Sequence, residues 1–158
     1  MAGLRLRDAR LPSEGFGHVF LGGAGPMLAY RIARDAVRLC IDVPFTAPAD
    51  RAWLLASYRA ALPEALRDSF ERELQSGELA WAINAVRPRT DYGTPGLALL
   101  GDAVGFQHPL TAVGMSLGLS DAVELARAPT FRDWESARRR SVRAAELLAG
   151  ALYEAFSV

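Results

Sequence analysis

Residues 96–122 carry the most specific pattern in the chain and read Gly96-Leu-Ala-Leu-Leu-Gly-Asp-Ala-Val-Gly-Phe-Gln-His-Pro-Leu-Thr-Ala-Val-Gly-Met-Ser-Leu-Gly-Leu-Ser-Asp-Ala122. The apolar run Leu97 to Leu100 predicts a short buried strand that stops at Gly101-Asp102. A loop containing His108-Pro109 follows, and a helix is predicted from about Ala112. A carboxylate in a glycine turn at the end of a strand can accept hydrogen bonds from the hydroxyl groups of a ligand. The combination favours a ligand site over the alternative, a plain turn beside a tightly packed helix.

The predicted helix has one face without large side chains. Gly114, Gly118 and Ala122 are four residues apart, so they lie on the same side of the helix. Another backbone or a flat ligand can come close to the helix there. The first turn of the helix also offers unpaired N–H groups to an electron-rich ligand edge.

The first third of the chain predicts antiparallel strands. Residues 17–22 are short and apolar, while residues 26–33 and 37–43 alternate between apolar and polar side chains, as half-buried strands do. Arg34-Asp35 is predicted to be the turn between the last two strands. The glycine run Gly22-Gly-Ala-Gly25 is predicted to be a loop and not a nucleotide-binding turn, because a strand follows it where a dinucleotide fingerprint needs a helix. The result is an antiparallel meander covered on one side.

The middle of the chain predicts two helices, which makes the fold class α+β. One is expected from Pro48 to about Leu62, and the next begins at Pro63 and ends at Gly77. Their apolar stripes are typical of core packing. Residues 79–86 are predicted to form another strand, and residues 91–96 a loop.

Composition excludes several classes of protein. The chain has 158 residues, of which 51% are hydrophobic and 23% charged, so disorder and low complexity are excluded. Its formal net charge is zero, which predicts no nucleic-acid partner for the chain as a whole. One cysteine, Cys40, and two histidines, His18 and His108, predict no metal site.

Both ends of the sequence carry features that relate to the expected cellular location of the protein. The first ten residues lack the apolar core of a secretion signal, and a cytoplasmic location is expected. Arg138-Arg139-Arg140 and Arg143 form a basic cluster ahead of an apolar helix, Ala144 to Phe156. Such a cluster is usually a solvated helix face. Contact with anionic lipid headgroups is the alternative, so peripheral attachment to a membrane stays open.

Four short motifs in the decisive segment resemble the second flavin motif of FAD-dependent monooxygenases, and the resemblance is to the squalene epoxidase type. They are Gly101-Asp102-Ala103, His108-Pro-Leu-Thr111, Gly114-Met115 and Ser120-Asp121. The likeness extends over nearly the whole chain. Residues 25–32 and 37–44 look like the paired substrate-domain strands of that family, and residues 147–157 are similar to its C-terminal helix.

The resemblance implies an FAD site built from the turn and the helix start. Asp102 would bind the ribityl chain of FAD, and the loop from Pro109 to Met115 would place backbone N–H groups near the flavin ring. The family has three glycines where this chain has Ala112-Val113-Gly114, which leaves the close approach at Val113 open. Asp121, further along the helix, is expected to matter less for FAD binding. The candidate cofactor-binding residues are Gly101, Asp102, Pro109, Leu110, Thr111, Ala112, Val113, Gly114 and Met115.

The same resemblance divides the chain and implies its partners. Residues 1–95 would be substrate-domain strands and helices, residues 96–127 the flavin-binding segment, and residues 128–158 the C-terminal helix. The family grips the ADP half of FAD with a Gly-x-Gly-x-x-Gly unit that this sequence does not contain. The chain therefore resembles the C-terminal half of such an enzyme, as a fragment, a split subunit or a truncated gene product. The implied partners are a separate chain carrying the N-terminal FAD half and a reductant or reductase.

The implied reaction is epoxidation, the insertion of one oxygen atom from O2 into a hydrophobic alkene. The family's catalytic tyrosine lies in the half that is not matched, so no catalytic residue is assigned. Leu28, Tyr30 and Ile32 are candidates for lining a hydrophobic substrate pocket, with ordinary core packing as the alternative, and His108 is favoured as a buried loop histidine over a group that acts on the flavin. Two other functions stay open: a non-catalytic remnant serving as an interaction or hydrophobic-ligand module, and part of a flavin hydroxylase that acts on an aromatic or quinone-like substrate.

Overall fold

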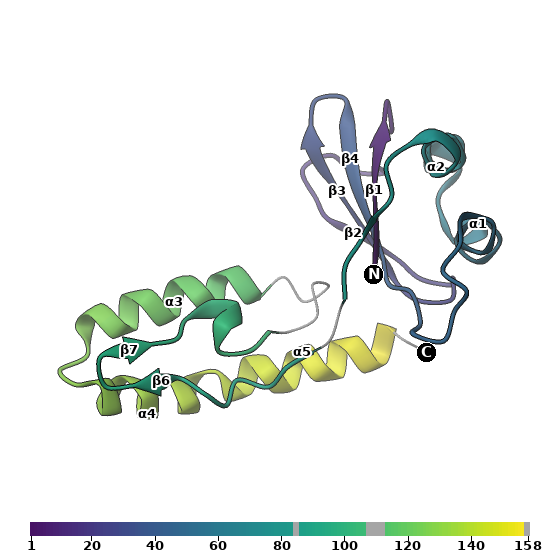
Figure 1. Cartoon of the computed structure of the whole chain (residues 1–158). Coiled ribbons are helices and arrows are strands. Elements are labelled where there is room, and N and C mark those ends of the chain that lie inside the picture. The colour runs from purple at the N-terminus through teal and green to yellow at the C-terminus, as the bar shows by residue number, and fades with distance from the viewer. Residues whose placement is uncertain (84–85, 107–112, 157–158) are drawn as a thin grey trace. The chain divides into compact units, whose positions relative to one another are not determined.

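The computed structural model describes residues 1–83, 86–106 and 113–156 of the chain. Its residues divide into two compact units, Met1–Asn84 and Ala85–Ala155, which are described separately (Figure 1). None of the helices in the described ranges is long and apolar enough to cross a membrane.

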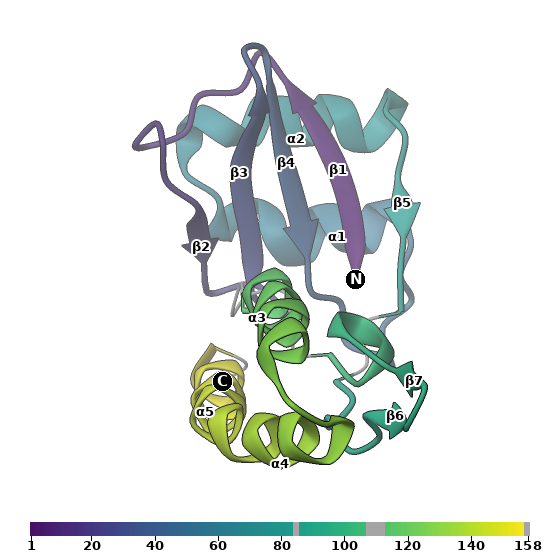
Figure 2. The ribbon, with the colours of Figure 1, turned by 90° about the vertical axis from the view of Figure 1, so that its left-hand side faces the viewer.

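The first unit is an antiparallel sheet with two helices on one face. The strand order is β2-β3-β4-β1-β5, and every neighbouring pair is antiparallel. Figure 2 shows α1 and α2 behind the sheet and nothing of the first unit in front of it. This arrangement confirms the predicted α+β class. The elements are β1 (Ala2–Arg7), β2 (His18–Phe20), β3 (Met27–Ala33), β4 (Ala36–Ile41), α1 (Arg51–Tyr58), the 3-10 helix η1 (Arg59–Ala61), α2 (Glu64–Ser76) and β5 (Ala80–Trp81).

The predicted meander and both predicted helices are confirmed. β2, β3 and β4 pair in sequence, with the turn at Arg34-Asp35. Helix α1 begins after Asp50, whose side chain accepts a hydrogen bond from the N–H of Trp53 at 2.7 Å, and α2 ends before Gly77. Strand β1 is not among the predicted strands, although Leu4 and Leu6 alternate with arginines in the way a half-buried strand requires. The strand predicted over residues 79–86 is only Ala80–Trp81.

The core of the first unit lies between the sheet and the two helices. Leu4, Leu39 and Ala29 are neighbours across β1, β4 and β3, and all three are fully buried. Leu54 of α1 and Phe70 of α2 pack into the same cluster. Burial of a side chain of this size contributes about 1.5–3 kcal/mol, so this layer accounts for the stability of the unit.

The opposite face of the sheet is open within this unit. Leu28 is half-buried, and Tyr30 and Ile32 are exposed on the face that the helices do not cover. Cys40 lies opposite Leu28 in the register and is half-buried as well. The interpretation of Leu28, Tyr30 and Ile32 as core residues is therefore wrong, because alternation along β3 places them on the side away from the core.

The glycine run between β2 and β3 is a loop, as predicted, and it packs closely on other parts of the unit. A Cβ atom on Gly23 would lie 2.6 Å from the ring of Tyr58, and one on Gly25 would lie 2.6 Å from the carbonyl oxygen of Asp42. The Tyr58 hydroxyl donates a hydrogen bond to that same carbonyl at 2.5 Å. Glycine is required here by packing.

In the residues that the structure describes, the second unit has a short hairpin, a 3-10 turn and three helices. The elements are β6 (Gly93–Thr94), β7 (Leu97–Ala98), the 3-10 helix η2 (Gly101–Ala103), α3 (Gly114–Arg127), α4 (Phe131–Ser141) and α5 (Arg143–Phe156). Thr130 caps α4, because its hydroxyl accepts a hydrogen bond from the N–H of Asp133 at 3.2 Å.

Several boundaries in the second unit differ from the prediction. The strand predicted over residues 97–100 reaches only Ala98 and is not buried, because Leu97 is 65% exposed. Its partner strand β6 lies inside the predicted loop 91–96, where Gly93 and Gly96 adopt positive φ angles of 95° and allow a tight hairpin. The predicted apolar helix over residues 144–156 is confirmed as α5, but residues 128–158 hold a second helix, α4, where a single C-terminal helix is predicted. Helix α3 begins at Gly114, two residues after the predicted start.

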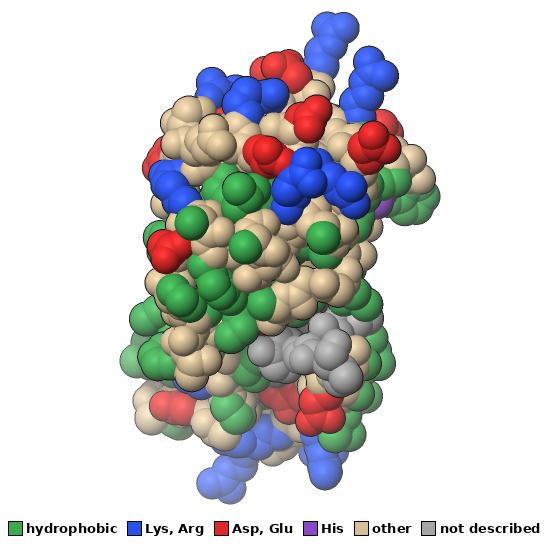
Figure 3. Space-filling view, turned by 90° about the vertical axis from the view of Figure 1, so that its right-hand side faces the viewer, with side chains coloured by type: hydrophobic (Ala, Val, Ile, Leu, Met, Phe, Trp, Pro, Cys, Tyr) green, Lys and Arg blue, Asp and Glu red, His purple; other side chains and the backbone are tan. Residues whose placement is uncertain are grey.

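The charged side chains of the first unit gather over α2. Figure 3 views the helical side, where acidic and basic groups lie over α2 and hydrophobic groups lie below them. One of the α2 carboxylates is buried: Glu73 is 2% exposed. Arg7 of β1 donates to it from Nε and Nη2 at 3.1 Å each, and these hydrogen bonds hold the pKa of Glu73 below its ordinary value. The pair joins α2 to β1.

We predict that Glu73→Gln weakens the first unit at neutral pH and reduces its sensitivity to acid. Because the pKa of Glu73 is lower in the folded state than in the unfolded state, its carboxylate stabilises the fold above about pH 4.3. That contribution is lost as the pH falls through the folded-state value. Denaturant unfolding at a series of pH values measures both effects. Glu71 lies on the same helix as Glu73 and forms a partly exposed ion pair with Arg59. Glu71→Gln should therefore leave the acid dependence of stability in place. Identical pH profiles for Glu73→Gln and the parent chain would contradict the prediction.

Candidate functional site

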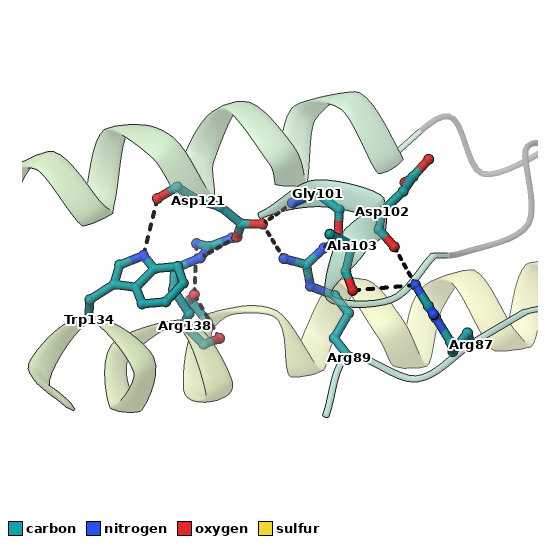
Figure 4. Close-up of polar contacts among 9 residues, drawn as sticks. Arg87, Arg89, Gly101, Asp102, Ala103, Asp121, Trp134 and Arg138 are labelled. Carbon is teal, nitrogen blue, oxygen red and sulfur yellow. Dashed lines mark hydrogen bonds and ion pairs between the residues drawn. The ribbon is translucent and has the colours of Figure 1, made fainter. Parts of the chain in front are cut away.

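The candidate site is built on the turn that follows β7. Leu100 is extended, and the chain then turns through Gly101–Ala103, with the N–H of Ala103 donating to the carbonyl of Leu100 at 3.2 Å. Gly101 has a φ of +56°, in the left-handed region that favours glycine. Asp102 is exposed, and its carboxylate points away from the interior of the unit (Figure 4). The turn therefore presents an acidic group to the outside.

A buried carboxylate, that of Asp121 on α3, lies under this turn. It is fully buried and accepts a hydrogen bond from the N–H of Gly101 at 2.9 Å (Figure 4). Arg138 of α4 donates to the other oxygen, Oδ1, from Nε at 2.9 Å, while Arg89 donates to Oδ2, the oxygen that accepts from Gly101. Both arginine side chains are nearly buried. Buried charges are tolerated only when they are paired and hydrogen-bonded, which this cluster achieves.

The arginines also hold the carbonyl groups of the turn. Arg89 donates to the carbonyl of Gly101 at 3.2 Å, and Arg87 donates to those of Asp102 at 2.5 Å and Ala103 at 3.4 Å. Three successive carbonyl oxygens thus accept hydrogen bonds from guanidinium groups. Figure 4 shows the Asp102 side chain on the other side of the turn from Arg87 and Arg89. The backbone conformation of the turn is fixed by these charge-assisted bonds.

The small-residue face of α3 lies against the same turn. A Cβ atom on Gly118 would be 3.3 Å from the Cα of Gly101, and one on Gly114 would be 3.8 Å from Oδ1 of Asp102. The small-residue face is predicted to lie against either another backbone or a flat ligand. At Gly118 it lies against the backbone of Gly101. The start of α3 lies beside the exposed carboxylate.

A small aromatic cluster completes the unit around Asp121. The Trp134 indole donates to the Asp121 carbonyl at 3.1 Å, and the Tyr92 ring lies edge-on to Trp134 with centroids 5.6 Å apart. Arg139 lies 5.0 Å from the centroid of Tyr92 and pairs with Glu135 on the surface. The interpretation of residues 138–140 as a solvated face is therefore wrong for Arg138, which faces inward to Asp121.

The described part of the predicted FAD site brings Asp102 and the helix start together. Gly101, Asp102 and Gly114 lie together as given above, while Met115 is 85% exposed. Val113 is the N-cap of α3, and its apolar side chain cannot accept from the first N–H groups; no side chain in the described part of the chain caps that end. An exposed carboxylate beside an uncapped helix start fits a ligand with hydroxyl groups and an electron-rich edge, as FAD has. His108, Pro109, Leu110, Thr111 and Ala112 lie outside the described residues.

Asp121, Arg89 and Arg138 were not predicted as site residues. The prediction that Asp121 matters less for FAD binding stays a prediction, but its carboxylate contacts the turn directly at Gly101. A signal exists in the sequence: Asp121 follows Gly118 by three residues, so it lies on the small-residue face and not on the solvent side. Its arginine partners are 32 and 17 residues away, and no local pattern identifies them.

Comparison with known proteins gives one consistent group of relatives. The family model described as squalene epoxidase matches residues 1–156. Squalene epoxidase erg1 of Aspergillus fumigatus is 31% identical over 180 residues, covering 98% of this chain and 37% of that protein. Squalene epoxidase 3 of Arabidopsis thaliana is 33% identical, covering 98% and 33%. The chain spans about a third of the length of these two relatives.

Solved structures with the same fold are flavin enzymes. PqsL of Pseudomonas aeruginosa, in complex with 2-aminobenzoylacetate, superposes with a TM-score of 0.70 at 20% identity, covering 99% of this chain and 48% of that one. An HpxO variant of Klebsiella pneumoniae, complexed with FAD, superposes with a TM-score of 0.65 at 18% identity, covering 94% and 43%. These likenesses confirm that the fold is part of a flavin-monooxygenase fold.

We predict that Gly118→Val destabilises the second unit by about 1–3 kcal/mol, because the added side chain must push Gly101 away from α3. Gly150→Ala is the matched control, since a Cβ atom there has nothing within 4 Å and alanine is favoured by about 1 kcal/mol inside a helix. Thermal and denaturant unfolding compare the two variants with the parent chain. Equal stability for Gly118→Val and the parent would show that the backbone contact is not tight.

Proposed function

The chain belongs to the squalene epoxidase family, and we propose that it supplies the flavin-side turn and the substrate-domain sheet of an FAD-dependent monooxygenase. The match of the family model to residues 1–156 is the observation that carries the proposal. The proposed reaction is the transfer of one oxygen atom from O2 to a carbon–carbon double bond of a hydrophobic substrate such as squalene. When bound in its reduced form, FAD supplies the two electrons with which the second oxygen atom becomes water.

Asp102 is proposed to bind the ribityl chain of FAD. Its carboxylate is exposed, and no residue that the structure describes donates a hydrogen bond to it. A carboxylate accepts only, so its partner must be a donor such as a ribityl hydroxyl. The uncapped start of α3 supports a place for the flavin ring, because helix N-termini favour electron-rich groups. Within residues 109–115, the backbone N–H groups after Pro109, which has none, would be the donors.

The open face of the sheet is proposed to contact the hydrophobic substrate. Leu28, Tyr30, Ile32 and Cys40 give this face an apolar part over β3 and β4, next to Arg38, which lies opposite Tyr30 in the register, and no helix of the first unit covers it. Partial burial raises the pKa of Tyr30 above its ordinary value, so its hydroxyl stays neutral at physiological pH. These residues would orient an apolar chain and exclude water from the reacting carbon atoms.

The proposed partners follow from the share of the relatives that the chain matches. The proposed enzyme needs a Gly-x-Gly-x-x-Gly half for the ADP end of FAD, and a reductant or reductase for its electrons. Met115, Leu119 and Val123 form an exposed apolar stripe along α3, at the four-residue spacing of one helix face. We propose that the FAD half covers this stripe, whether it is carried on the same chain or on another.

We predict that Asp102→Ala weakens FAD binding about 10- to 150-fold, because a hydrogen bond to a charged group contributes about 1.5–3 kcal/mol. Quenching of flavin fluorescence measures the affinity of the 158-residue chain, alone and together with a second chain that carries the Gly-x-Gly-x-x-Gly half of such an enzyme. Binding by the 158-residue chain alone should be weak. Gly114→Val should also weaken binding, because its side chain would lie beside Asp102.

Glu124→Ala is the matched control for this experiment, since it removes another exposed carboxylate from the far end of α3. It should leave the affinity for FAD unchanged. Equal affinity for Asp102→Ala and the parent would remove Asp102 from the cofactor site. No FAD binding by the folded and associated pair would favour a non-catalytic remnant. Turnover of an aromatic compound and not of squalene would favour the flavin hydroxylase.

We predict that the chain alone aggregates or dimerises through the α3 stripe. An exposed helix face of this kind is costly to leave in water. Leu119→Glu should therefore shift the chain toward monomer in sedimentation velocity, while Glu124→Gln should not. A parent chain that is already monodisperse and monomeric would contradict the prediction.

A further inference from the structure

We propose that Asp121 is a positioning residue, which sets the direction of the Asp102 carboxylate by fixing the peptide groups of Gly101. The proposal rests on the proposed function only in naming FAD as the ligand that Asp102 meets. Asp121 itself is fully buried, so it acts through the turn and does not contact the ligand. Its effect on the turn is testable without FAD.

The geometry holds Gly101 from both sides. The N–H of Gly101 donates to Asp121 at 2.9 Å, and the carbonyl of Gly101 accepts from Arg89 at 3.2 Å. Arg89 is itself bonded to the same carboxylate oxygen of Asp121 as the Gly101 N–H. Gly101, Asp121 and Arg89 therefore close a ring of hydrogen bonds around one residue (Figure 4). Both peptide planes of Gly101 are fixed, and Asp102 follows directly.

Glycine at position 101 makes such a device necessary. With a φ of +56° and no side chain, Gly101 has the widest conformational freedom of any residue in the turn. A turn held only by its own backbone bonds, such as that from Val104 N–H to the carbonyl of Gly101 at 3.1 Å, would leave the Asp102 side chain free to swing. The ring of hydrogen bonds through Asp121 and Arg89 removes this freedom before a ligand arrives, and this lowers the entropy cost of binding.

The charges explain why a carboxylate is used here. Asp121 carries one negative charge between the two positive charges of Arg89 and Arg138. Removing it would leave two buried guanidinium groups without a counter-ion, a strongly unfavourable state. Replacement of Arg89 is milder, because it leaves the Asp121–Arg138 pair balanced. Comparing the two replacements therefore distinguishes loss of the hydrogen bonds that fix the turn from loss of stability of the whole unit.

Two variants and one control test the proposal in the full chain. Asp121→Asn weakens the whole ring, and Arg89→Met removes its bridge to the Gly101 carbonyl while it keeps a balanced ion pair. Trp134→Phe is the control, because it perturbs the apolar core and loses a bond to the Asp121 carbonyl but leaves the side-chain hydrogen bonds of Asp121 and Arg89 to Gly101 in place. Hydrogen exchange followed by mass spectrometry compares a peptide covering residues 99–104 with one covering residues 125–130, which includes the Ala128 N–H bonded to Glu124.

We expect exchange in the turn peptide to accelerate at least tenfold relative to the second peptide in Arg89→Met, and in Asp121→Asn if it folds. Trp134→Phe should change both peptides by the same factor. Equal acceleration of both peptides in Arg89→Met would mean that the cluster only stabilises the unit, and the proposal would be overturned.

FAD titration of the same variants, with the second chain present, separates this proposal from the proposed function. Arg89→Met should weaken FAD binding about tenfold in the parent background and less than twofold in the Asp102→Ala background, because it acts through Asp102. Full additivity of the two effects would overturn the proposal. No FAD binding by the parent pair would refute the FAD role of Asp102, while the exchange result would still decide whether Asp121 positions the turn.

Discussion

The second unit depends on one buried carboxylate and its two arginines. Its apolar core is small in the described range: Tyr92, Val104 and Trp134 form one buried cluster, and Val142 and Ala149 are buried outside it. Such a core cannot by itself fix three helices and a turn. Asp121 connects them: it bonds α4 through Arg138, the segment before β6 through Arg89 and the turn through Gly101. A carboxylate left without any of these partners would be costly to bury, so the burial of Asp121 depends on its neighbours.

The first unit is organised in a different way. Its sheet and helices enclose a continuous apolar layer, and polar contacts such as Arg7–Glu73 act at the edge of that layer. An apolar layer tolerates exchange of one hydrophobic residue for another of similar size. The charge cluster of the second unit tolerates such exchanges less well, because each side chain in it forms a hydrogen bond or ion pair with a particular partner. The two units therefore differ in how much sequence change each can accept.

The sequence predicts the parts of the fold that follow from local rules. Alternation along β3 and β4 and the caps of α1 and α2 are local, and each appears where the pattern places it. The turn at Gly101-Asp102 and the close approach at Gly118 were also predictable, because glycine spacing is visible along the chain. Arg89 and Arg138 were not, since their roles depend on a carboxylate far away in sequence. Leu97 to Leu100 misled because hydrophobicity alone cannot distinguish a buried strand from a hairpin with an exposed edge.

The contact between Gly101 and Gly118 sets the distance from the turn to α3 with main-chain atoms on both sides. Side chains in a protein interior change rotamer on short timescales, and a spacing that depends on them varies accordingly. A spacer made of two backbones has no rotamers. The separation between the acidic turn and α3 at Gly118 is consequently set by main-chain packing, which no rotamer change can alter.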